Sequence, residues 1–218
     1  MTGQCPTPAL WRLLQVKLFG NDDCGSARIE SGRITVDNRP YVLRSDRLGF
    51  REYREGDLLQ LAEMFGDSYA RRFYPEHGSD DRLQGWIAWN QRNYASHGFG
   101  LWVIEFLGSG RFVGDAGLTF QEVEASSLLE IGYHVHPKFR CQGFATEAAL
   151  ACLRWAFEST THDLVCSIVH PENVASIRVA EKTHRLRRPI QGKSGPSLLF
   201  YTTRQAWNSE RQPETRVE

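Results

Sequence analysis

One eight-residue segment has the composition of an anion-binding loop. Residues 140–147 read Arg-Cys-Gln-Gly-Phe-Ala-Thr-Glu, between a β-rich run that ends at Pro137 and an Ala- and Leu-rich run from Ala148 to Phe157. A tight loop that opens a helix presents free backbone N–H groups and the positive end of the helix dipole, which suit a pyrophosphate. Gly143 lets the backbone approach closely, and Ala145 keeps the first turn small. The segment predicts a phosphate site at the start of a helix.

Two side chains just before this loop could move protons. Glu130, Gly132 and His134 alternate along a strand-like run, so they share one face, and Gly132 leaves space there. A carboxylate or an imidazole on such a face can accept a proton from a reacting group. Glu130 is the first candidate base and His134 the alternative, although Glu130 could equally be a structural partner of a neighbouring element. A free backbone N–H in a splayed strand near Val135 could stabilise an oxyanion.

A second motif follows the helical run. Residues 163–169 read as a buried strand, and residues 171–182 read Pro-Glu-Asn-Val-Ala-Ser-Ile-Arg-Val-Ala-Glu-Lys. With the opening segment Leu43–Asp57, the two motifs resemble, in order, the GNAT superfamily of N-acetyltransferases over residues 42–206. The branch that the chain most resembles is that of the ribosomal-protein N-terminal (Rim-type) acetyltransferases.

The resemblance implies an α/β fold: a twisted, mostly antiparallel sheet of about six to seven strands, a splayed pair at the cofactor site, and helices on both faces. It implies that acetyl-CoA is bound by Val135, Arg140, Cys141, Gln142, Gly143, Phe144, Ala145, Thr146 and Asn173. Asn173 would contact the pantetheine arm, or serve as a helix N-cap, or do both. Ser176, one turn later, would lie near the sulfur as a possible proton donor.

The chain departs from the family pattern at two places. Cys141 stands where a glycine is common, which narrows the loop but keeps its N–H groups. Thr183-His184 replaces a Leu-Gly pair after the second motif, so the easy left-handed exit from that helix is lost. We therefore expect a rearranged turn after residue 182.

The acceptor side is predicted from aromatic and acidic residues. The expected cleft is walled by one loop with Phe73 and Tyr74 and by a strand connection with Gln121, Glu122 and Glu124. Aromatic faces and carboxylates suit a cation. The resulting hypothesis is an acetyl-CoA-dependent N-acetyltransferase that acts by direct attack in a ternary complex, on a small amine or a protein N-terminus. The alternative is a non-catalytic acyl-CoA-binding or regulatory module.

Other elements follow from periodicity and turn residues. The expected elements are a first strand Val42–Tyr53, a helix capped by Asp57 and ending at Phe65, a loop Arg71–Pro75, a helix from Asp80 or Asp81 to His97, a hairpin of Gly100–Phe106 with Arg111–Phe120, and a last strand Ser197–Thr203. Trp86 and Trp89 are interpreted as core or helix-packing residues.

Composition bounds the remaining possibilities. The 218 residues carry 26 basic and 26 acidic side chains, and this balance disfavours nucleic-acid and membrane-surface partners. Five cysteines without Cys-x-x-Cys spacing indicate reduced thiols in a cytoplasmic protein. His134 and His136 alternate, but no third ligand with suitable spacing is evident, so no metal site is predicted.

The resemblance divides the chain into three parts. Residues 1–41 are an N-terminal extension, residues 42–206 the acetyltransferase domain, and residues 207–218 a C-terminal tail. The apolar run Ala9–Phe19 is shorter than the roughly 20 residues of a membrane span. The extension could hold an accessory helix and hairpin, with short β-like runs at Arg28–Glu30 and Arg33–Val36, or it could be a mobile arm. A monomer or homodimer is expected.

Overall fold

The computed structural model describes residues 27–30, 33–36, 40–193 and 195–211. The two short runs near the N-terminus form β1 (Ala27–Glu30) and β2 (Arg33–Val36), which pair antiparallel as their composition indicated. The apolar run Ala9–Phe19 lies outside the described residues.

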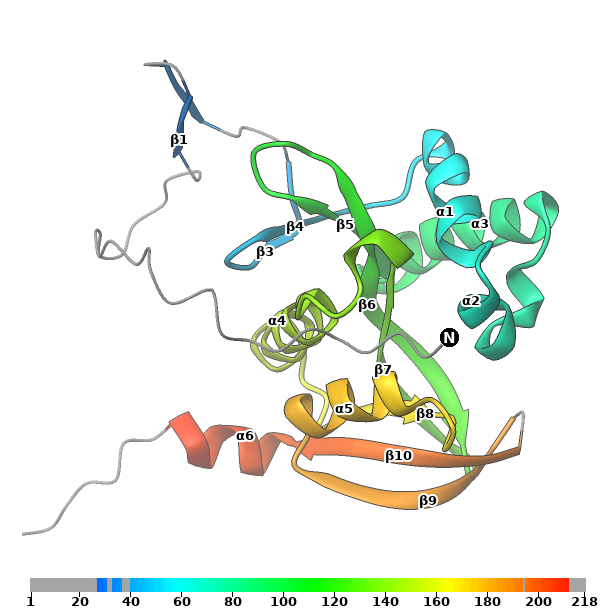
Figure 1. Ribbon diagram of the computed structural model, residues 1–218. Helices are drawn as coiled ribbons and strands as arrows, with labels where there is room; N and C mark the ends of the chain where they lie inside the picture. Colours follow the sequence, from blue (N-terminus) through cyan, green and yellow to red (C-terminus); the bar gives the residue numbers. More distant parts are fainter. Residues whose placement is uncertain (1–26, 31–32, 37–39, 194, 212–218) are drawn as a thin grey trace, which may run out of the picture.

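An eight-stranded sheet organises the rest of the chain (Figure 1). Its strands are β3 (Leu43–Arg44), β4 (Leu48–Arg51), β5 (Leu101–Phe106), β6 (Phe112–Val123), β7 (Ser126–Val135), β8 (Leu164–Val169), β9 (Leu186–Gly192) and β10 (Gly195–Thr203). They lie in the order β3-β4-β5-β6-β7-β8-β10-β9. Every neighbouring pair is antiparallel except β7 and β8, which are parallel. The predicted mostly antiparallel sheet is confirmed.

Helices cover both faces of this sheet (Figure 1). They are η1 (Glu55–Asp57), α1 (Leu58–Phe65), α2 (Ser68–Phe73), η2 (Pro75–His77), α3 (Asp80–His97), η3 (Pro137–Phe139), α4 (Phe144–Ser159), α5 (Val174–Thr183) and α6 (Arg204–Arg211). Successive side chains of β5 point to opposite faces of the sheet and so belong to two different hydrophobic clusters. Trp102 and Ile104 pack in one cluster with α4, whereas Leu101 and Val103 pack in another with α1 and α3. No described helix is both long enough and apolar enough to cross a membrane.

Two predicted elements at the N-terminal side were wrong. The run Val42–Tyr53 is not one strand, because a turn interrupts it: the Ser45 N–H donates to the Leu48 carbonyl at 2.9 Å. This turn separates β3 from β4 and accounts for the larger number of strands. The predicted loop Arg71–Pro75 overlaps helix α2, whose N-cap Asp67 accepts a hydrogen bond from the Ala70 N–H at 2.9 Å. The helices α1 and α3 and the β5–β6 hairpin are confirmed. Asp57 precedes α1 as predicted, but its side chain does not cap the helix, because it accepts from Arg51 and from the Arg54 N–H.

Strands β6 and β7 form a longer hairpin than the sequence indicated. Their connection is only Glu124-Ala125, with φ of 48° and 65°, as in a two-residue hairpin turn. Gln121 and Glu122 therefore lie within β6 and not in a connecting loop. This hairpin places β7, which carries both candidate bases, directly beside β6.

Strands β7 and β8 separate soon after they meet. Their parallel pairing is limited to Leu129 with Val165 and Glu130 with Cys166. Just beyond this point two side chains bridge the strands: the Ser167 hydroxyl donates to the Ile131 carbonyl at 2.9 Å, and the Glu130 carboxylate accepts from the Ile168 N–H at 3.1 Å. The predicted splayed pair is present, and Glu130 lies at its apex.

Helix α5 ends without a left-handed residue. The chain leaves it at His184 in an extended conformation (φ −110°, ψ 163°), and the His184 N–H donates to the Ala180 carbonyl at 2.8 Å. The imidazole is buried between the hydroxyls of Ser167 and Thr202. Burial lowers its pKa to about 4, so this side chain is neutral. A buried hydrogen-bonded histidine thus replaces the glycine exit that the resemblance implied.

The C-terminal part of the chain continues the fold past residue 206. Helix α6 includes residues 207–211, which the sequence assigned to a tail, and the Trp207 ring stacks on the Phe157 ring of α4 with centroids 5.5 Å apart. The packing of α6 therefore fixes the end of α4 that lies farthest from the loop at residues 140–143.

Candidate active site

Two cavities meet at the splayed strands. The first, the loop cavity, has a volume of about 470 Å³ and is lined by the start of α4, by Phe65 and Tyr69, and by one face of α5. The second, the aromatic cavity, has a volume of about 440 Å³ and is lined by Phe73, Tyr74, His77, Trp86, Trp89 and Glu130, among others. Among the described residues, four line both cavities: Tyr74, Tyr133, His134 and Ser176. These four mark the junction of the two cavities.

The loop cavity opens onto the start of α4. Cys141 has a φ of 61° and Gly143 a φ of 83°, so the chain turns sharply twice before the helix begins. The first N–H groups of α4 have no partner within their own helix, as at any helix start. Arg47 from the β3–β4 turn braces the loop, because its guanidinium donates to the Gln142 carbonyl at 3.2 Å and to Glu147 of α4 at 2.6 Å. The predicted tight loop at a helix start is therefore present, and the binding of an anion there stays a prediction.

Most of the predicted cofactor residues line this cavity. The predicted residues that do so are Val135, Arg140, Cys141, Gly143, Phe144, Ala145 and Thr146. Arg178 and Lys182 from α5 also line this cavity. Gln142 is not among the lining residues, and it offers its carbonyl to Arg47. Arg140 lines the cavity, but its guanidinium pairs with Asp67 and its Nε donates to the Val135 carbonyl at 3.1 Å. In this structure the Arg140 side chain braces the loop against α2 and β7.

Asn173 and Ser176 lie where α5 meets the splay. Asn173 caps α5, since its side-chain oxygen accepts from the Ser176 N–H at 3.1 Å and from the Tyr69 hydroxyl at 2.6 Å. It is buried and lines the aromatic cavity. The Ser176 carbonyl accepts a hydrogen bond from the Tyr133 hydroxyl at 3.0 Å, which ties α5 to β7. The capping role of Asn173 is thus observed, and Ser176 lies at the junction of the cavities.

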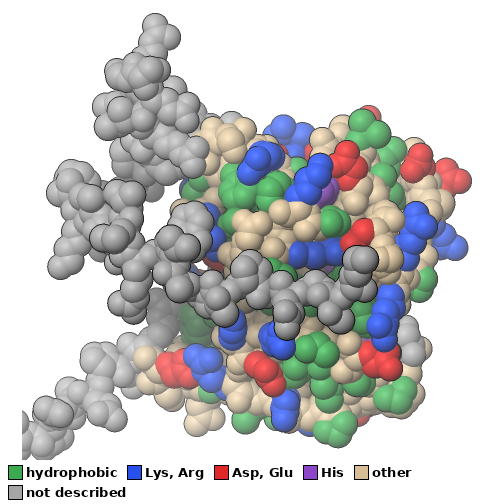
Figure 2. Space-filling view, in the orientation of Figure 1, with side chains coloured by type: hydrophobic (Ala, Val, Ile, Leu, Met, Phe, Trp, Pro, Cys, Tyr) green, Lys and Arg blue, Asp and Glu red, His purple; other side chains and the backbone are tan. Residues whose placement is uncertain are grey.

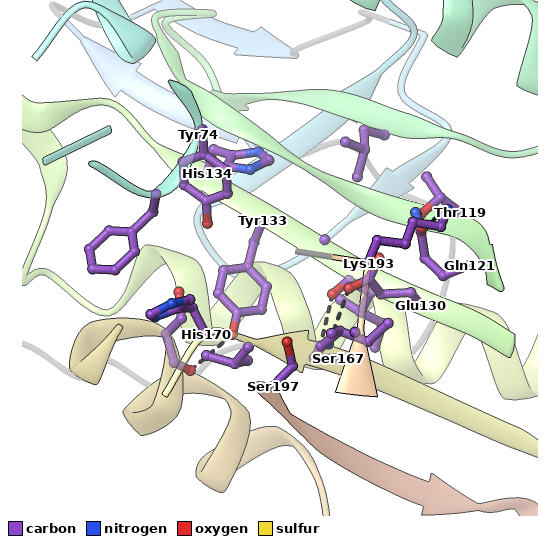
Figure 3. Close-up of a pocket in the computed structure, with 18 of the residues that line it drawn as sticks. Tyr74, Thr119, Gln121, Glu130, Tyr133, His134, Ser167, His170, Lys193 and Ser197 are labelled. Carbon is purple, nitrogen blue, oxygen red and sulfur yellow. Dashed lines mark hydrogen bonds between the residues drawn. The ribbon is translucent and has the colours of Figure 1, made fainter. Parts of the chain in front are cut away.

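Glu130 lies at the end of the aromatic cavity away from this junction. Figure 3 shows Tyr74 and His134 together at one end and Thr119, Gln121, Glu130 and Lys193 at the other, with Tyr133 between them. Burial raises the pKa of Glu130 to about 7, although the hydrogen bond from Ile168 and the charge of His134 oppose this rise. A carboxyl with this pKa can accept or release a proton near neutral pH.

The carboxylate of Asp115 contacts the imidazole of His134. Its Nδ1 lies 2.6 Å from Oδ1 of Asp115, and the His134 side chain is 11% exposed whereas that of Asp115 has no exposed surface. The other oxygen of Asp115 accepts from the Tyr53 hydroxyl and from the Trp86 indole N–H. The sequence interpretation missed Asp115. The signal that could have found it is the β6–β7 register, which pairs Asp115 directly with His134.

Aromatic side chains form the wall opposite β7. Phe73 and Tyr74 line the aromatic cavity as predicted, and so do Gln121 and Glu122, although from a strand and not from a loop. The interpretation of Trp86 and Trp89 as packing residues only was incomplete, because both line the cavity and their rings stack 5.2 Å apart. Glu124 is instead paired with Arg188 at 2.8 Å.

His134 and His136 point to different partners. The His136 imidazole lies 3.3 Å from the Glu63 carboxylate on α1, whereas His134 contacts Asp115. Three arginines that follow α5 are paired with carboxylates on the surface: Arg185 with Glu210, Arg187 with Glu181 and Arg188 with Glu124. Figure 2 shows Lys and Arg side chains interspersed with Asp and Glu over the visible face. This distribution agrees with the zero formal charge of the chain.

Comparisons with known proteins are consistent with this architecture. A family model described as an acetyltransferase (GNAT) domain matches residues 47–184. The chain is 34% identical over 146 residues to the uncharacterized protein YkkB of Bacillus subtilis (strain 168), covering 66% of this chain and 85% of that protein.

Solved structures with the same fold are also similar. An acetyltransferase from Agrobacterium tumefaciens str. C58 matches with a TM-score of 0.64 and 24% identity, over 78% of this chain and 98% of that one. A structure of AAC(6')-Ib in complex with ribostamycin and coenzyme A matches with a TM-score of 0.63 and 18% identity, over 77% and 99% of the two chains. At these identities the structural matches bear on the fold alone.

Proposed function

Because this chain belongs to the GNAT acetyltransferase family, whose members use acetyl-CoA to acetylate amines, we propose that it transfers an acetyl group from acetyl-CoA to a primary amine by direct attack in a ternary complex. The observation that carries the proposal is the pair of cavities that meet at Tyr74, Tyr133, His134 and Ser176. Two reactants that enter from opposite sides would meet only at this junction, and holding them there supplies much of the rate enhancement of a two-substrate reaction.

Acetyl-CoA fits the loop cavity on chemical grounds. The N–H groups at the start of α4 and the cations Arg178 and Lys182 suit its phosphates. Gly143, with its positive φ, lets the backbone approach them. The pantetheine arm would follow the gap between β7 and β8, past Asn173. Bound acetyl-CoA supplies an activated acetyl thioester, whose sulfur is a fair leaving group because thiols have a pKa of about 8.5.

Residues at the junction and along the two cavities have separate proposed roles. The hydroxyl of Ser176 donates to the departing sulfur. The N–H of Val135 stabilises the oxyanion. The Val135 carbonyl accepts a hydrogen bond from Arg140, and the Ile131 carbonyl accepts one from Ser167, so both carbonyls point away from β6 into the splay. In an antiparallel strand the N–H and the carbonyl of one residue point to the same side, so the Val135 N–H also points into the splay. Glu130 or His134 accepts the proton that the amine loses.

The aromatic cavity favours a small amine over a protein N-terminus. Its volume of about 440 Å³ is in the range of small-molecule pockets. Tyr74, Trp86 and Trp89 offer aromatic faces, and Glu76, Glu122 and Glu130 offer carboxylates, which attract an ammonium group before it is deprotonated. An acceptor of the ribosomal-protein type would need a peptide to enter by its N-terminus, and the experiment below includes that case.

A panel of acceptors tests the proposal. The protein is incubated with acetyl-CoA and with small primary amines, matched alcohols or short peptides, and free coenzyme A is measured against an acceptor-free control. We expect thiol release with one or more small amines and none with the matched alcohols. Preferred turnover of peptides would assign the protein-N-terminus acceptor instead. Tight acetyl-CoA binding without turnover across the panel would support a non-catalytic acyl-CoA-binding or regulatory module.

A further inference from the structure

Asp115 and His134 are held together by the backbone of the hairpin. They are directly opposed residues of the β6–β7 pairing, which places their side chains on one face of the sheet. The neighbouring pair is Gly114 with Val135, and a Cβ added at Gly114 would lie 2.0 Å from the His134 carbonyl oxygen. Only glycine admits this close approach. The backbone therefore fixes the Asp115–His134 pair before any side-chain contact is considered.

The contacts of Asp115 determine the tautomer of His134. The Trp86 indole is a donor only, and burial together with the charge of Asp115 raises the pKa of Tyr53, so Tyr53 keeps its proton and donates it. One oxygen of Asp115 therefore accepts both of these hydrogen bonds. The carboxylate accepts the third bond from Nδ1–H of His134, which leaves the lone pair of neutral His134 on Nε2.

His134 is better placed than Glu130 to meet the attacking nitrogen. It lines both cavities, whereas Glu130 lines only the aromatic cavity. The two residues are four positions apart on one strand, which separates their Cα atoms by roughly 13 Å. Of the other residues at the junction, Tyr74 and Tyr133 have pKa values raised by burial, so they remain protonated, and Ser176 is a hydroxyl. Of the four side chains at the junction, the imidazole of His134 is the one with a basic nitrogen lone pair that can accept a proton.

We propose that Nε2 of His134 accepts the proton of the attacking amine and that Asp115, supported by Tyr53 and Trp86, is the positioning residue that orients it. The inference rests on the proposed N-acetyltransferase function. It assigns Glu130 to the binding of the acceptor at the far end of the aromatic cavity, where its carboxylate attracts a cationic group.

The proton balance of the reaction is complete with these residues. An ammonium acceptor loses one proton to Nε2 of His134, and its lone pair then forms the N–C bond to the thioester carbon. The C–S bond breaks and its electron pair goes to sulfur. Ser176 gives its proton to the sulfur and takes the second proton from the nitrogen. The products are the amide, free coenzyme A and an imidazolium, which releases its proton to solvent through the open cleft.

The test is the pH dependence of kcat with an amine from the panel. The titratable groups that interact with His134 are Asp115 on β6, Glu130 on β7, and Tyr74 and His77 around η2. Tyr53, after β4, contacts Asp115. The wild type should show a limb in which the rate rises with pH as His134 loses its proton. His134→Gln should remove that limb and lower kcat by at least about a hundredfold, within the range of general-base effects.

The positioning role of Asp115 has its own signature. In Asp115→Asn the side-chain amide can donate to Nδ1 and place the proton on Nε2, so kcat should fall by a similar factor. The limb should also move to lower pH, because the neighbouring negative charge is lost. The acetyl-CoA affinity should stay within about twofold of wild type in both variants. Trp86→Phe, which removes one of the three bonds to Asp115, should give a smaller loss and serves where Asp115→Asn does not fold.

Matched measurements separate the possible outcomes. Glu130→Gln should raise KM for the amine but keep the limb, and added imidazole should restore rate to His134→Ala but not to Asp115→Asn. The inference is overturned while the proposed function stands if the wild type acetylates the amine and His134→Gln keeps the limb. A limb lost only in Glu130→Gln would transfer the role of base to Glu130. If the wild type releases no coenzyme A with any acceptor, the proposed function and this inference both fail.

Discussion

The loop cavity is built mainly on the backbone of one stretch of chain, residues 140–146, with Arg178 and Lys182 of α5 beside it. The aromatic cavity takes side chains from α2, α3, β6, β7, β8 and the β9–β10 hairpin. A backbone site depends on φ angles and on a helix start, so one local stretch of sequence specifies it. A side-chain site depends on register and on helix packing, so it exists only in the finished fold. The two cavities should therefore respond to different substitutions, and each prediction below tests this separation.

The largest expected contrast is in how stability depends on pH. Burial raises the pKa of Glu130 from 4.5 to about 7. Between these values the folded protein holds a proton on Glu130 that the unfolded chain has released, so stability falls as the pH rises through this window, by at most about 3 kcal/mol. Glu130→Gln should remove this dependence. We therefore expect the difference in free energy of unfolding, Glu130→Gln minus wild type, to be more positive at pH 8 than at pH 5. Urea unfolding at the two pH values measures this difference.

The control for Glu130 is another carboxylate of the same cavity. Glu122→Gln changes an exposed residue of the neighbouring strand β6, so its effect on stability should be small and similar at both pH values. An equal difference between Glu130→Gln and wild type at pH 5 and pH 8 would contradict the buried-charge account of this residue.

The next contrast concerns the backbone site. Gly143→Val should weaken acetyl-CoA binding at least tenfold, roughly 1.4 kcal/mol, because a φ of 83° is strained for a β-branched residue and the loop must shift. Calorimetric titration measures this change. Gly85→Val is the matched control, since Gly85 lies in α3 and a Cβ added there meets nothing within 4 Å. Unchanged affinity in a folded Gly143→Val protein would refute the loop assignment.

Asn173 should separate a structural role from a binding role. Asn173→Ala removes the cap of α5 and the partner of the Tyr69 hydroxyl, so it should cost about 1 kcal/mol of stability and also weaken acetyl-CoA binding. Asn173→Ser keeps a capping oxygen but lacks the amide N–H groups. It should recover most of the stability and not the affinity. If both variants bind acetyl-CoA as wild type does, Asn173 is only a cap.

The smallest expected effect is confined to the aromatic cavity. Gly132 lies between Glu130 and His134 on β7, and a Cβ added there would come 3.1 Å from the Leu101 side chain. Gly132→Ala should therefore raise KM for the amine a few-fold, less than about 1 kcal/mol, without changing acetyl-CoA affinity. Steady-state kinetics together with calorimetry measure the two effects. Loss of acetyl-CoA binding in this variant would show that the cavities are coupled.

The same difference explains what the sequence could predict. The loop at residues 140–143 was found because a glycine, a small residue and a following helical run are local signals, and helix α3 was found from its acidic start and from Gly98 at its end. The turn between β3 and β4 was missed although Ser45 and Asp46 are residues that favour turns. It contains no glycine or proline, and its hydrogen bond is visible only in the fold.

The acceptor side was predicted only in part. Glu130, His134, Phe73, Tyr74, Gln121 and Glu122 all line the aromatic cavity, which agrees with their residue types. Asp115 was missed because its role depends on the register of β6 against β7. That register is set by the turn Glu124-Ala125, which lacks the Asn-Gly or Asp-Gly signature of two-residue hairpin turns. Without a recognised turn, no sequence pattern pairs Asp115 with His134.

The short β6–β7 turn also limits how the length of this protein can change. From the turn outwards, the residue number in β6 falls by one for each rise of one in β7, without a break from Val123–Ser126 to Gly114–Val135. Inserting or deleting one residue in either strand would therefore slip the register. A slip of one residue sends every following side chain to the opposite face of the sheet, and Asp115 would then point toward α4. Residues 107–111 connect β5 to β6 beyond the last pair of their ladder, so an insertion there would lengthen a turn and leave the β6–β7 register unchanged. Homologues that keep the Asp115–His134 pair should therefore differ in length at residues 107–111 and not between residues 115 and 134.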